Sequence, residues 1–316
     1  MQTQGPVSTF PYRAEERGVQ SRDKPGNLWS GHLFGLQIKI NASSLWPGSA
    51  WAALCGAIAS GRIGLGAPSL LRLLVVLFLA DPVLGGIWEL VSGTDWFAPF
   101  ARAHLPSEEA PVKSLPYTSP GSPGYHASRW LAGVLAWWRR DFRPYAGTEF
   151  LSLILTVAVA ILLASLLGPQ VALVILVTFG LMAMALFAPH RHLWRAILEW
   201  GLPWLMGHLT FGPLNWPSVV LALAYTGAYY AGLILLGGQW RAATRWLNGS
   251  QIAAVALLVF VKEPILAGIV GLLLLPQLLL QPFLWRGEAE WWYWQRSQLW
   301  LMAGILIAAL AIGGAP

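Results

Sequence analysis

The sequence is poor in cysteine and in charge. Cys55 is the only cysteine among 316 residues, which excludes a disulfide within the chain and a metal site built from several cysteines. Charged residues make up 11% of the chain, whereas soluble globular domains carry roughly 25%. Hydrophobic residues reach 56%. These proportions exclude an ordinary soluble domain and predict an integral membrane protein.

The first 48 residues lack a long apolar run. They are polar and rich in Gly and Pro, without the apolar core that a cleavable signal peptide needs. We therefore expect segment 1–48 to be retained as a cytoplasmic N-terminal segment. The transmembrane bundle is expected over residues 49–313.

Apolar runs of about 20 residues can cross a bilayer as helices. Nine such runs can be placed, near 49–66, 69–93, 149–167, 170–188, 195–211, 216–237, 250–262, 264–283 and 296–313. The seventh is short, so the sequence at 262–264 (Lys-Glu-Pro) is compatible with a turn between two helices or with a kink in one long helix. The predicted fold class is an all-α, polytopic membrane bundle of about nine helices.

The positions of the basic residues support this topology. With the N-terminus inside, the far face receives only Arg62, Arg72 and Lys262, out of 20 Lys and Arg residues. Lys and Arg are enriched in cytoplasmic loops of membrane proteins, so the net charge of +6 does not call for a nucleic-acid partner. The C-terminus is expected on the side opposite the cytoplasm.

The segment 95–148 is predicted to be a cytoplasmic loop that contains an interfacial helix. Its first part is rich in Pro, Gly and Ser, and its second part reads "ASRWLAGVLAWWRRDF". One helical face of this second part is apolar and has basic edges; the apolar residues are Trp130, Leu131, Val134, Leu135, Trp137 and Trp138, and the basic ones Arg129, Arg139 and Arg140. Such a helix can lie in the membrane interface or pack on the protein's own cytoplasmic surface.

The chain contains 19 tryptophans. The stretch "EWWYWQRSQLW" before the last span has the pattern of an aromatic belt at the lipid headgroups, although the same rings could line a pigment. We expect the bilayer to be one partner, and other membrane proteins to bind through the 95–148 loop and the Trp-rich surfaces.

Two carboxylates interrupt the second span, "LFLADPVLGGIWELVSGTDWF". Asp81 and Glu89 are eight residues apart, a little over two turns, and so project from nearly the same side of a helix. Two such groups could hold Mg²⁺, which prefers oxygen ligands. The alternative is that Glu89 is solvated near the interface and that Asp81, before Pro82, satisfies backbone donors at a kink.

The fifth span and the loop before it carry further polar residues. Glu199 and His208 lie within the span, and such a histidine could be a hydrogen-bonded packing residue or an axial ligand of a pigment or haem. The preceding "APHRHLWR" gathers Arg191 and Arg195 with two histidines, a cluster that could bind phosphate or simply flank the span.

The order of these features resembles the UbiA superfamily of intramembrane prenyltransferases, from about residue 36 to the C-terminus. The likeness rests on nine helices, a carboxylate-bearing end of helix two before the largest cytoplasmic loop, and basic loops after helices four and six. Supporting stretches are "LQIKINASSLWPGSAWAALCGAIASG", "LFAPHRHLWR", "WRAATRWL", "LPQLLLQPFLW" and "QRSQLWLMAGILIAALAI". The resemblance implies a UbiA-like helical bundle in which two aspartate-rich motifs hold Mg²⁺ against a prenyl diphosphate.

The sequence departs from this family at those motifs. If Asp81 matches the first motif aspartate, the next two fall on Leu84 and Trp88, and Glu89 is one position out of register. The second motif region reads "AYYAGLILLGGQW" and has no carboxylate. The remaining cations that could face a diphosphate are Arg191, Arg195, Arg241 and Arg245.

The expected function is therefore that of a degenerate, non-catalytic UbiA-like subunit of a larger membrane complex. It would bind an isoprenoid, a quinone or a pigment. The alternative is an active prenyltransferase with an altered Mg²⁺ site at Asp81 and Glu89, acting on a prenyl diphosphate and an aromatic or tetrapyrrole acceptor. A transporter is the third class, but the nine spans contain no evident inverted repeat.

Overall fold

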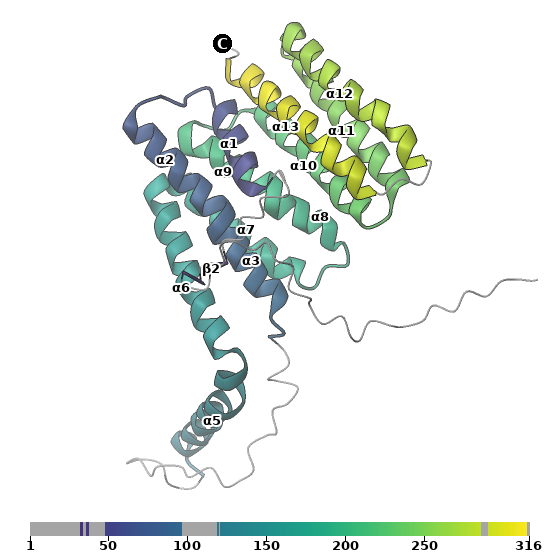
Figure 1. Cartoon of the computed structure of the whole chain (residues 1–316). Helices are drawn as coiled ribbons and strands as arrows, with labels where there is room; N and C mark the ends of the chain where they lie inside the picture. The colour runs from purple at the N-terminus through teal and green to yellow at the C-terminus, as the bar shows by residue number, and fades with distance from the viewer. Residues whose placement is uncertain are drawn as a thin grey trace, which may run out of the picture.

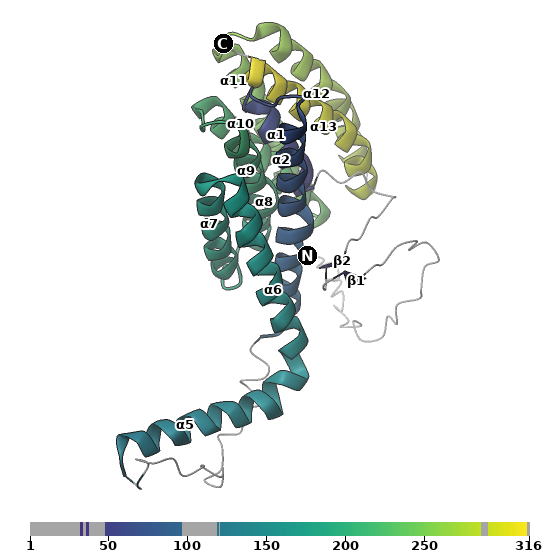
Figure 2. The same ribbon diagram turned by 90° about the vertical axis from the view of Figure 1, so that its left-hand side faces the viewer.

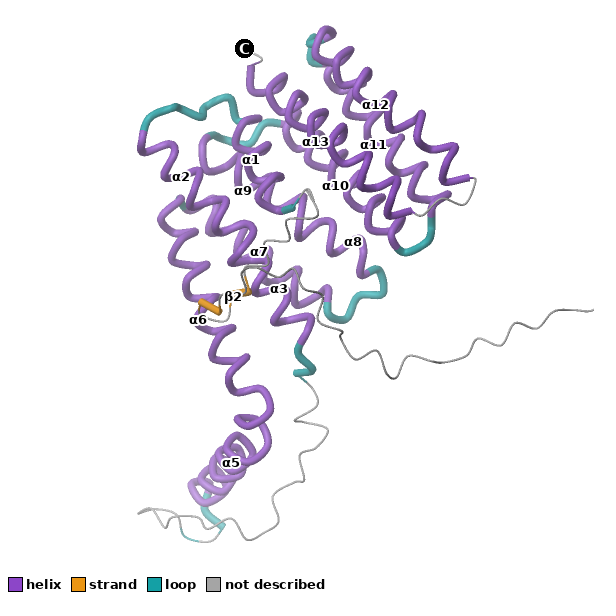
Figure 3. Tube along the Cα trace, viewed as in Figure 1, coloured by secondary structure: helices purple, strands orange, loops and turns teal. Residues whose placement is uncertain are grey.

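The computed structural model describes residues 32–33, 36–37, 48–96, 119, 121–285 and 290–314. Apart from one pair of two-residue antiparallel strands, β1 (His32–Leu33) and β2 (Leu36–Gln37), its regular elements are helices joined by short connections (Figure 3). Most of the predicted segment 1–48 and the first part of the 95–148 loop lie outside the described residues.

Each of the nine predicted runs coincides with a helix in the described ranges. Seven runs are single helices: α1 (Ser49–Ala59), α6 (Arg143–Leu167), α7 (Pro169–Ala185), α10 (Trp216–Leu236), α11 (Trp240–Phe260), α12 (Pro264–Trp285) and α13 (Glu290–Gly314). The second run is a continuous rod of α2 (Ala67–Phe78), η1 (Leu79–Val83) and α3 (Leu84–Gly93). The fifth run is a second rod, of α8 (Arg191–Ala196), η3 (Ile197–Gly201) and α9 (Leu202–Phe211). The predicted loop helix is α5 (Pro123–Trp137), which continues through η2 (Trp138–Phe142) into α6.

Within the described ranges, five helical segments are long and apolar enough to cross a membrane. They are Ala67–Gly93, Arg143–Leu167, Trp216–Leu236, Pro264–Leu284 and Glu290–Gly314. Two shorter apolar helices accompany them, Ser49–Ala59 and Pro169–Ala185. This set supports an integral membrane protein.

Several helix boundaries differ from or refine the sequence prediction, among them the start of α11 at Trp240, before the predicted residue 250. α1 ends at Ala59, before the predicted residue 66, and Gly61 follows with a φ of 66° that favours glycine. The stretch 262–264 is a turn, because α11 ends at Phe260, α12 begins at Pro264, and Lys262 has a φ of 66°. Helices seven and eight are therefore separate.

Two clusters of buried apolar residues hold the bundle together. One joins α10 to α13 with α1 and α9, and the other joins α2, η1, α6 and α7 with α9. Figure 1 shows α10 to α13 grouped on one side and α2, α6 and α7 on the other, with α1 and α9 between them. Large apolar side chains remain exposed on the outer surface, as expected for contact with lipid; on α6 they include Leu151, Leu162 and Leu166.

α1 touches its neighbours backbone to backbone. A Cβ atom added at Gly56 would lie 2.0 Å from the carbonyl oxygen of Trp204, and one added at Gly207 would lie 1.9 Å from that of Ala53. At the end of α1, a Cβ atom on Gly61 would lie 2.3 Å from the carbonyl oxygen of Gly313 in α13. Small residues thus allow α9 and α13 to approach α1 as closely as membrane helices can.

Four side-chain amides join α11 to α12. Gln251 and Gln277 exchange two hydrogen bonds, with N···O distances of 2.9 and 3.1 Å. Asn248 and Gln281 form a second reciprocal pair, at 3.2 and 2.7 Å. We call these four residues the amide ladder. Their amides satisfy one another inside an otherwise apolar contact.

Candidate functional site

Two carboxylates predicted inside the spans both lie in π-helical turns. Asp81 lies in η1 beside Pro82, whose ring nitrogen cannot donate to the helix ladder, and Glu199 lies in η3. Single π-turns within α-helices are frequent at functional sites, because they change the direction of a side chain. Glu199 acts electrostatically on Asp81, so the two rods bring these like charges near each other.

Glu199 is held by two side chains. The Arg195 Nε group donates to its Oε1 atom at 2.8 Å, and the Tyr229 hydroxyl donates to its Oε2 atom at 2.5 Å. Both are charge-assisted hydrogen bonds, the stronger kind in proteins. The Tyr229 ring stacks on Trp200, with centroids 5.5 Å apart, which fixes the direction of the hydroxyl.

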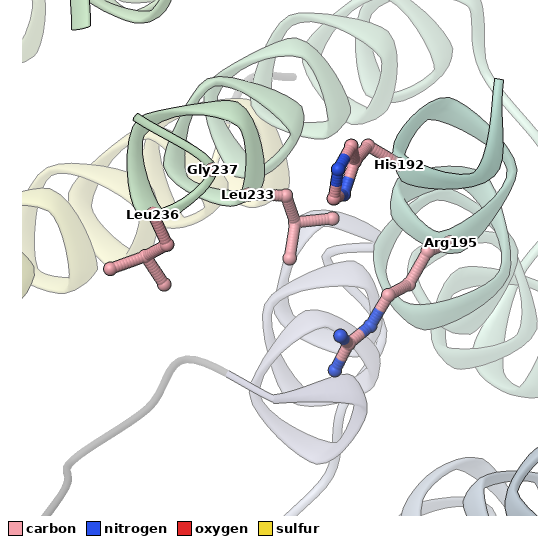
Figure 4. Close-up of a pocket in the computed structure, with 5 residues that line it drawn as sticks. All are labelled: His192, Arg195, Leu233, Leu236 and Gly237. Atoms are coloured by element: carbon pink, nitrogen blue, oxygen red, sulfur yellow. The ribbon is translucent and has the colours of Figure 1, made fainter. Parts of the chain in front are cut away.

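A cavity of about 440 Å³ opens beside this ion pair. His192 and Arg195 of α8 line one side of it, and Leu233, Leu236 and Gly237 at the end of α10 line the other (Figure 4). The cavity is therefore basic along one wall and apolar along the opposite wall, as a site for an amphiphile with a polar head would be.

Aromatic rings fill the contact between the second rod and α10. Trp200 faces Tyr229, and one turn further Trp204 faces Tyr225 with centroids 6.3 Å apart. The Nε1 atom of Trp200 and the hydroxyl of Tyr225 are buried without a hydrogen-bond partner within the described chain, as is Nε1 of Trp51 on α1. Buried donors without an acceptor are costly, so these three groups lower the stability of the contact.

The predicted basic residues fall in different places. Arg191 begins α8 and is exposed, and Arg195 is bound to Glu199. Arg241 lies over the Trp240 ring at 5.1 Å, and Arg245 lines a separate groove of about 400 Å³ between α10 and α11. Of these four arginines, only Arg195 lies at the ion pair with Glu199.

Glu89 is exposed in α3, about two turns beyond Asp81. Glu199 acts electrostatically on Asp81, and a joint site of Asp81 and Glu89 stays a prediction.

His208 belongs to a buried hydrogen-bond chain at the other end of α9. Its Nε2 atom lies 3.0 Å from the Pro213 carbonyl oxygen, and its Nδ1 atom lies 3.0 Å from the Ser218 hydroxyl, which accepts from Trp204 Nε1. A carbonyl oxygen only accepts, so Nε2 must donate and Nδ1 must accept. Both ring nitrogens are engaged, which favours packing over axial ligation among the two predicted roles.

The geometry at Glu199 does not fit the Mg²⁺ that the family resemblance implies. Both carboxylate oxygens are already engaged, one by Arg195 and the other by Tyr229. A cation there would approach the Arg195 guanidinium, and the like charges would repel. In the part of the chain that the structure describes, no three His, Cys, Asp or Glu side chains form a metal-binding group.

Comparison with known proteins gives one relative. The bacteriochlorophyll synthase 34 kDa chain of Chloroflexus aurantiacus is 27% identical over 265 residues, which cover 76% of this chain and 77% of that protein. This similarity supports the UbiA superfamily. No family model and no solved structure matches the chain. The all-helical architecture with its apolar helices agrees with a UbiA-like membrane bundle.

In this UbiA-like bundle, Tyr229 is the site residue that sequence reasoning missed. It lies in the stretch that occupies the second motif region, which drew attention only for its lack of carboxylates. The ion pair of Arg195 with Glu199 could have been predicted from the sequence, since residues four apart lie on the same face of a helix. The contact of Tyr229 with Glu199 could not, because it joins positions 30 residues apart.

Proposed function

We propose that this membrane protein is a non-catalytic, UbiA-like binding subunit. It holds an isoprenoid-tailed ligand within the bundle and does not transfer a prenyl group. The main support is the ion pair of Glu199 with Arg195, the arginine that would otherwise face a diphosphate.

The electrostatics of the site oppose prenyl diphosphate chemistry. A diphosphate leaves when positive charge neutralises the charge that develops on it, and metal ions supply several kcal/mol of this stabilisation in related chemistry. Here Arg195 is already paired with Glu199, so the formal charge of the pair is zero and little positive charge is left for a diphosphate. Each 1.36 kcal/mol of lost stabilisation costs tenfold in rate, and the expected rate is therefore negligible.

The side chains that line the cavity and the similarity to the Chloroflexus protein both indicate the class of ligand. The apolar wall at Leu233 and Leu236 suits a hydrocarbon tail, and the basic wall at His192 and Arg195 suits carbonyl oxygens. Quinones and chlorin pigments carry both features. The relative is named for bacteriochlorophyll synthesis, which favours a bacteriochlorophyll-type pigment among these ligands.

Native purification tests the binding role directly. We expect the isolated protein to carry chlorin absorption bands, or an isoprenoid mass in native mass spectrometry, and to copurify with other membrane proteins. Recovery as a lone, ligand-free protein would contradict the proposal.

A matched pair of variants locates the ligand. Leu236→Ala removes apolar surface from the wall of the cavity, whereas Leu223→Ala removes it from the separate groove between α10 and α11. In a titration with bacteriochlorophyll, we expect a severalfold loss of affinity in the first variant and no change in the second. Equal affinities in both would remove Leu236 from the binding site.

The second candidate is a working prenyltransferase, favoured by the retention of Asp81, on which Glu199, the partner of Arg195, acts electrostatically. It requires product from a labelled prenyl diphosphate and a chlorin acceptor with Mg²⁺, and loss of that product in Asp81→Ala. The Chloroflexus chain would serve as the positive control. We expect no product from this protein under conditions in which the control is active.

A further inference from the structure

α5 projects from the bundle at the N-terminal end of α6. Figure 2 shows it running sideways from the end of α6, away from the other helices. Its first turn is capped by Ser122, whose side chain accepts a hydrogen bond from the Tyr125 backbone at 3.1 Å. Within the described chain, its main packing partner is η2. α5 is therefore a well-formed helix that does not pack on the body of the bundle.

A cluster of aromatic rings fixes the angle between α5 and α6. Trp138 stacks on Phe142 with centroids 4.7 Å apart, and Phe142 meets Phe150 edge-on at 5.5 Å. Trp137 also contacts Phe142, at 5.3 Å. These rings span the end of α5, η2 and the first turns of α6, so the elbow is packed and the direction of α5 is set by the fold.

One long face of α5 is apolar and uncovered. The exposed fractions of its large apolar side chains are 69% for Trp130, 54% for Leu131, 38% for Val134 and 48% for Leu135. At 100° per residue, these four positions lie within one arc of the helix surface. An uncovered face of this kind at the end of a membrane bundle marks a surface for lipid or for a partner.

The edges of this apolar face and the elbow are basic. Arg129, Arg139, Arg140 and Arg143 are exposed there, and Asp141 is the only acidic residue in the sequence from Pro123 to Arg143. Each basic side chain close to an anionic membrane surface contributes about 1 kcal/mol of attraction. The charge of α5 is therefore complementary to anionic lipid headgroups.

The length of α6 brings α5 to headgroup depth. α6 has 25 residues and is about 38 Å long, whereas the hydrocarbon core of a bilayer is about 30 Å thick. Its first turns, which begin at Arg143 and Pro144, must then extend into the headgroup region. A helix that turns aside at this level lies along the membrane surface.

We propose that α5 binds the surface of an anionic bilayer, with Trp130, Leu131 and Val134 among the acyl chains and its arginines on lipid phosphates. This inference is independent of the ligand in the bundle. Of the two environments compatible with the sequence, the lipid surface and the protein's own cytoplasmic surface, we propose the lipid surface for α5.

Fluorescence quenching in liposomes tests this placement with the full-length chain. A bimane fluorophore is attached to Val134→Cys, on the apolar face, or to Ala136→Cys, two residues further and on the other side. The native Cys55 is fully buried and should not react with the fluorophore. Treating the unmodified protein with the same reagent measures any labelling of Cys55. In vesicles that contain phosphatidylglycerol, we expect brominated lipid to quench the fluorophore severalfold more at Val134 than at Ala136, and aqueous iodide to show the reverse order.

The basic residues provide the second arm of the test. Replacing Arg129, Arg139 and Arg140 with Gln should lower the lipid quenching at Val134 in phosphatidylglycerol vesicles to the value found in neutral vesicles. Equal lipid quenching at the two positions would overturn the proposal. Weak quenching of Val134 by both iodide and brominated lipid would also overturn it, because another protein or a second copy would then cover the face.

Discussion

Glu199 acts as an internal anion for Arg195. Its Oε1 atom accepts a hydrogen bond from the Arg195 guanidinium at 2.8 Å, and the Glu199 side chain is only 19% exposed. An external diphosphate must therefore compete with a group that is covalently part of the same helix, four residues away. We therefore expect the binding of an external anion at Arg195 to depend on the charge of Glu199.

We expect Glu199→Gln to bind inorganic pyrophosphate about tenfold more tightly than the unmodified protein, which corresponds to about 1.4 kcal/mol. The substitution keeps an acceptor for Tyr229 but removes the charge that competes for Arg195. Isothermal titration calorimetry measures the change. Glu263→Gln, which removes one negative charge in the turn between α11 and α12, is the matched control and should leave the affinity unchanged. The same affinity in both variants would show that Glu199 does not compete.

Glycines in α1 and α9 have no room for a side chain. Gly207→Ala would place a methyl group 1.9 Å from a backbone oxygen of α1, so one helix must move. We expect a loss of about 1–3 kcal/mol or more in the free energy of unfolding, as for overpacked cores. Gly180→Ala in α7 meets nothing within 4 Å and should be neutral or slightly stabilising, since Ala favours helix. Thermal unfolding in detergent compares the two, and similar melting temperatures would argue against the close contact.

At the scale of the elements, the amide ladder couples α11 to α12. Gln277→Leu removes one partner and leaves the buried amide of Gln251 without it, at a cost of about 1–3 kcal/mol. In the double variant Gln251→Leu with Gln277→Leu, neither amide is left behind. We expect the double variant to recover part of the lost stability, with a coupling energy of about 1 kcal/mol by thermal unfolding. Strictly additive losses would mean that the two amides do not interact.

The helices could largely be predicted from sequence, whereas their contacts could not. Long apolar runs fixed the positions of the spans because a bilayer demands about 20 apolar residues in each. The true start of α11 at Trp240 was missed, because its first half carries polar residues such as Arg245 and Asn248, the second of which pairs with Gln281 of α12. Likewise, the π-turns that direct Asp81 and Glu199 leave little trace in apolar periodicity.

At the scale of the whole molecule, the uneven distribution of basic residues predicts the orientation in the membrane. α10 runs from Trp216 to Leu236, so the turn before it and the turn after it lie at opposite ends of the bundle. With the N-terminus in the cytoplasm, Leu214 belongs to the far face and Gln239 to the cytoplasmic face. Both side chains are exposed.

A membrane-impermeant thiol reagent applied to intact cells should therefore label Leu214→Cys and spare Gln239→Cys until the cells are opened. Cys55 is buried and contributes no background. The reverse labelling order would invert the proposed topology.

The backbone contacts of α1 also have a consequence for biogenesis. α1 has only 11 residues, about 17 Å of helix, which is too short to span the hydrocarbon core by itself. During synthesis it enters the membrane long before Gly207 of α9 and Gly313 of α13, the partners against which its glycines fit. The packing of α1 is therefore completed only when α13 has left the ribosome, and a chain truncated before α13 would present an unfinished contact to membrane quality control.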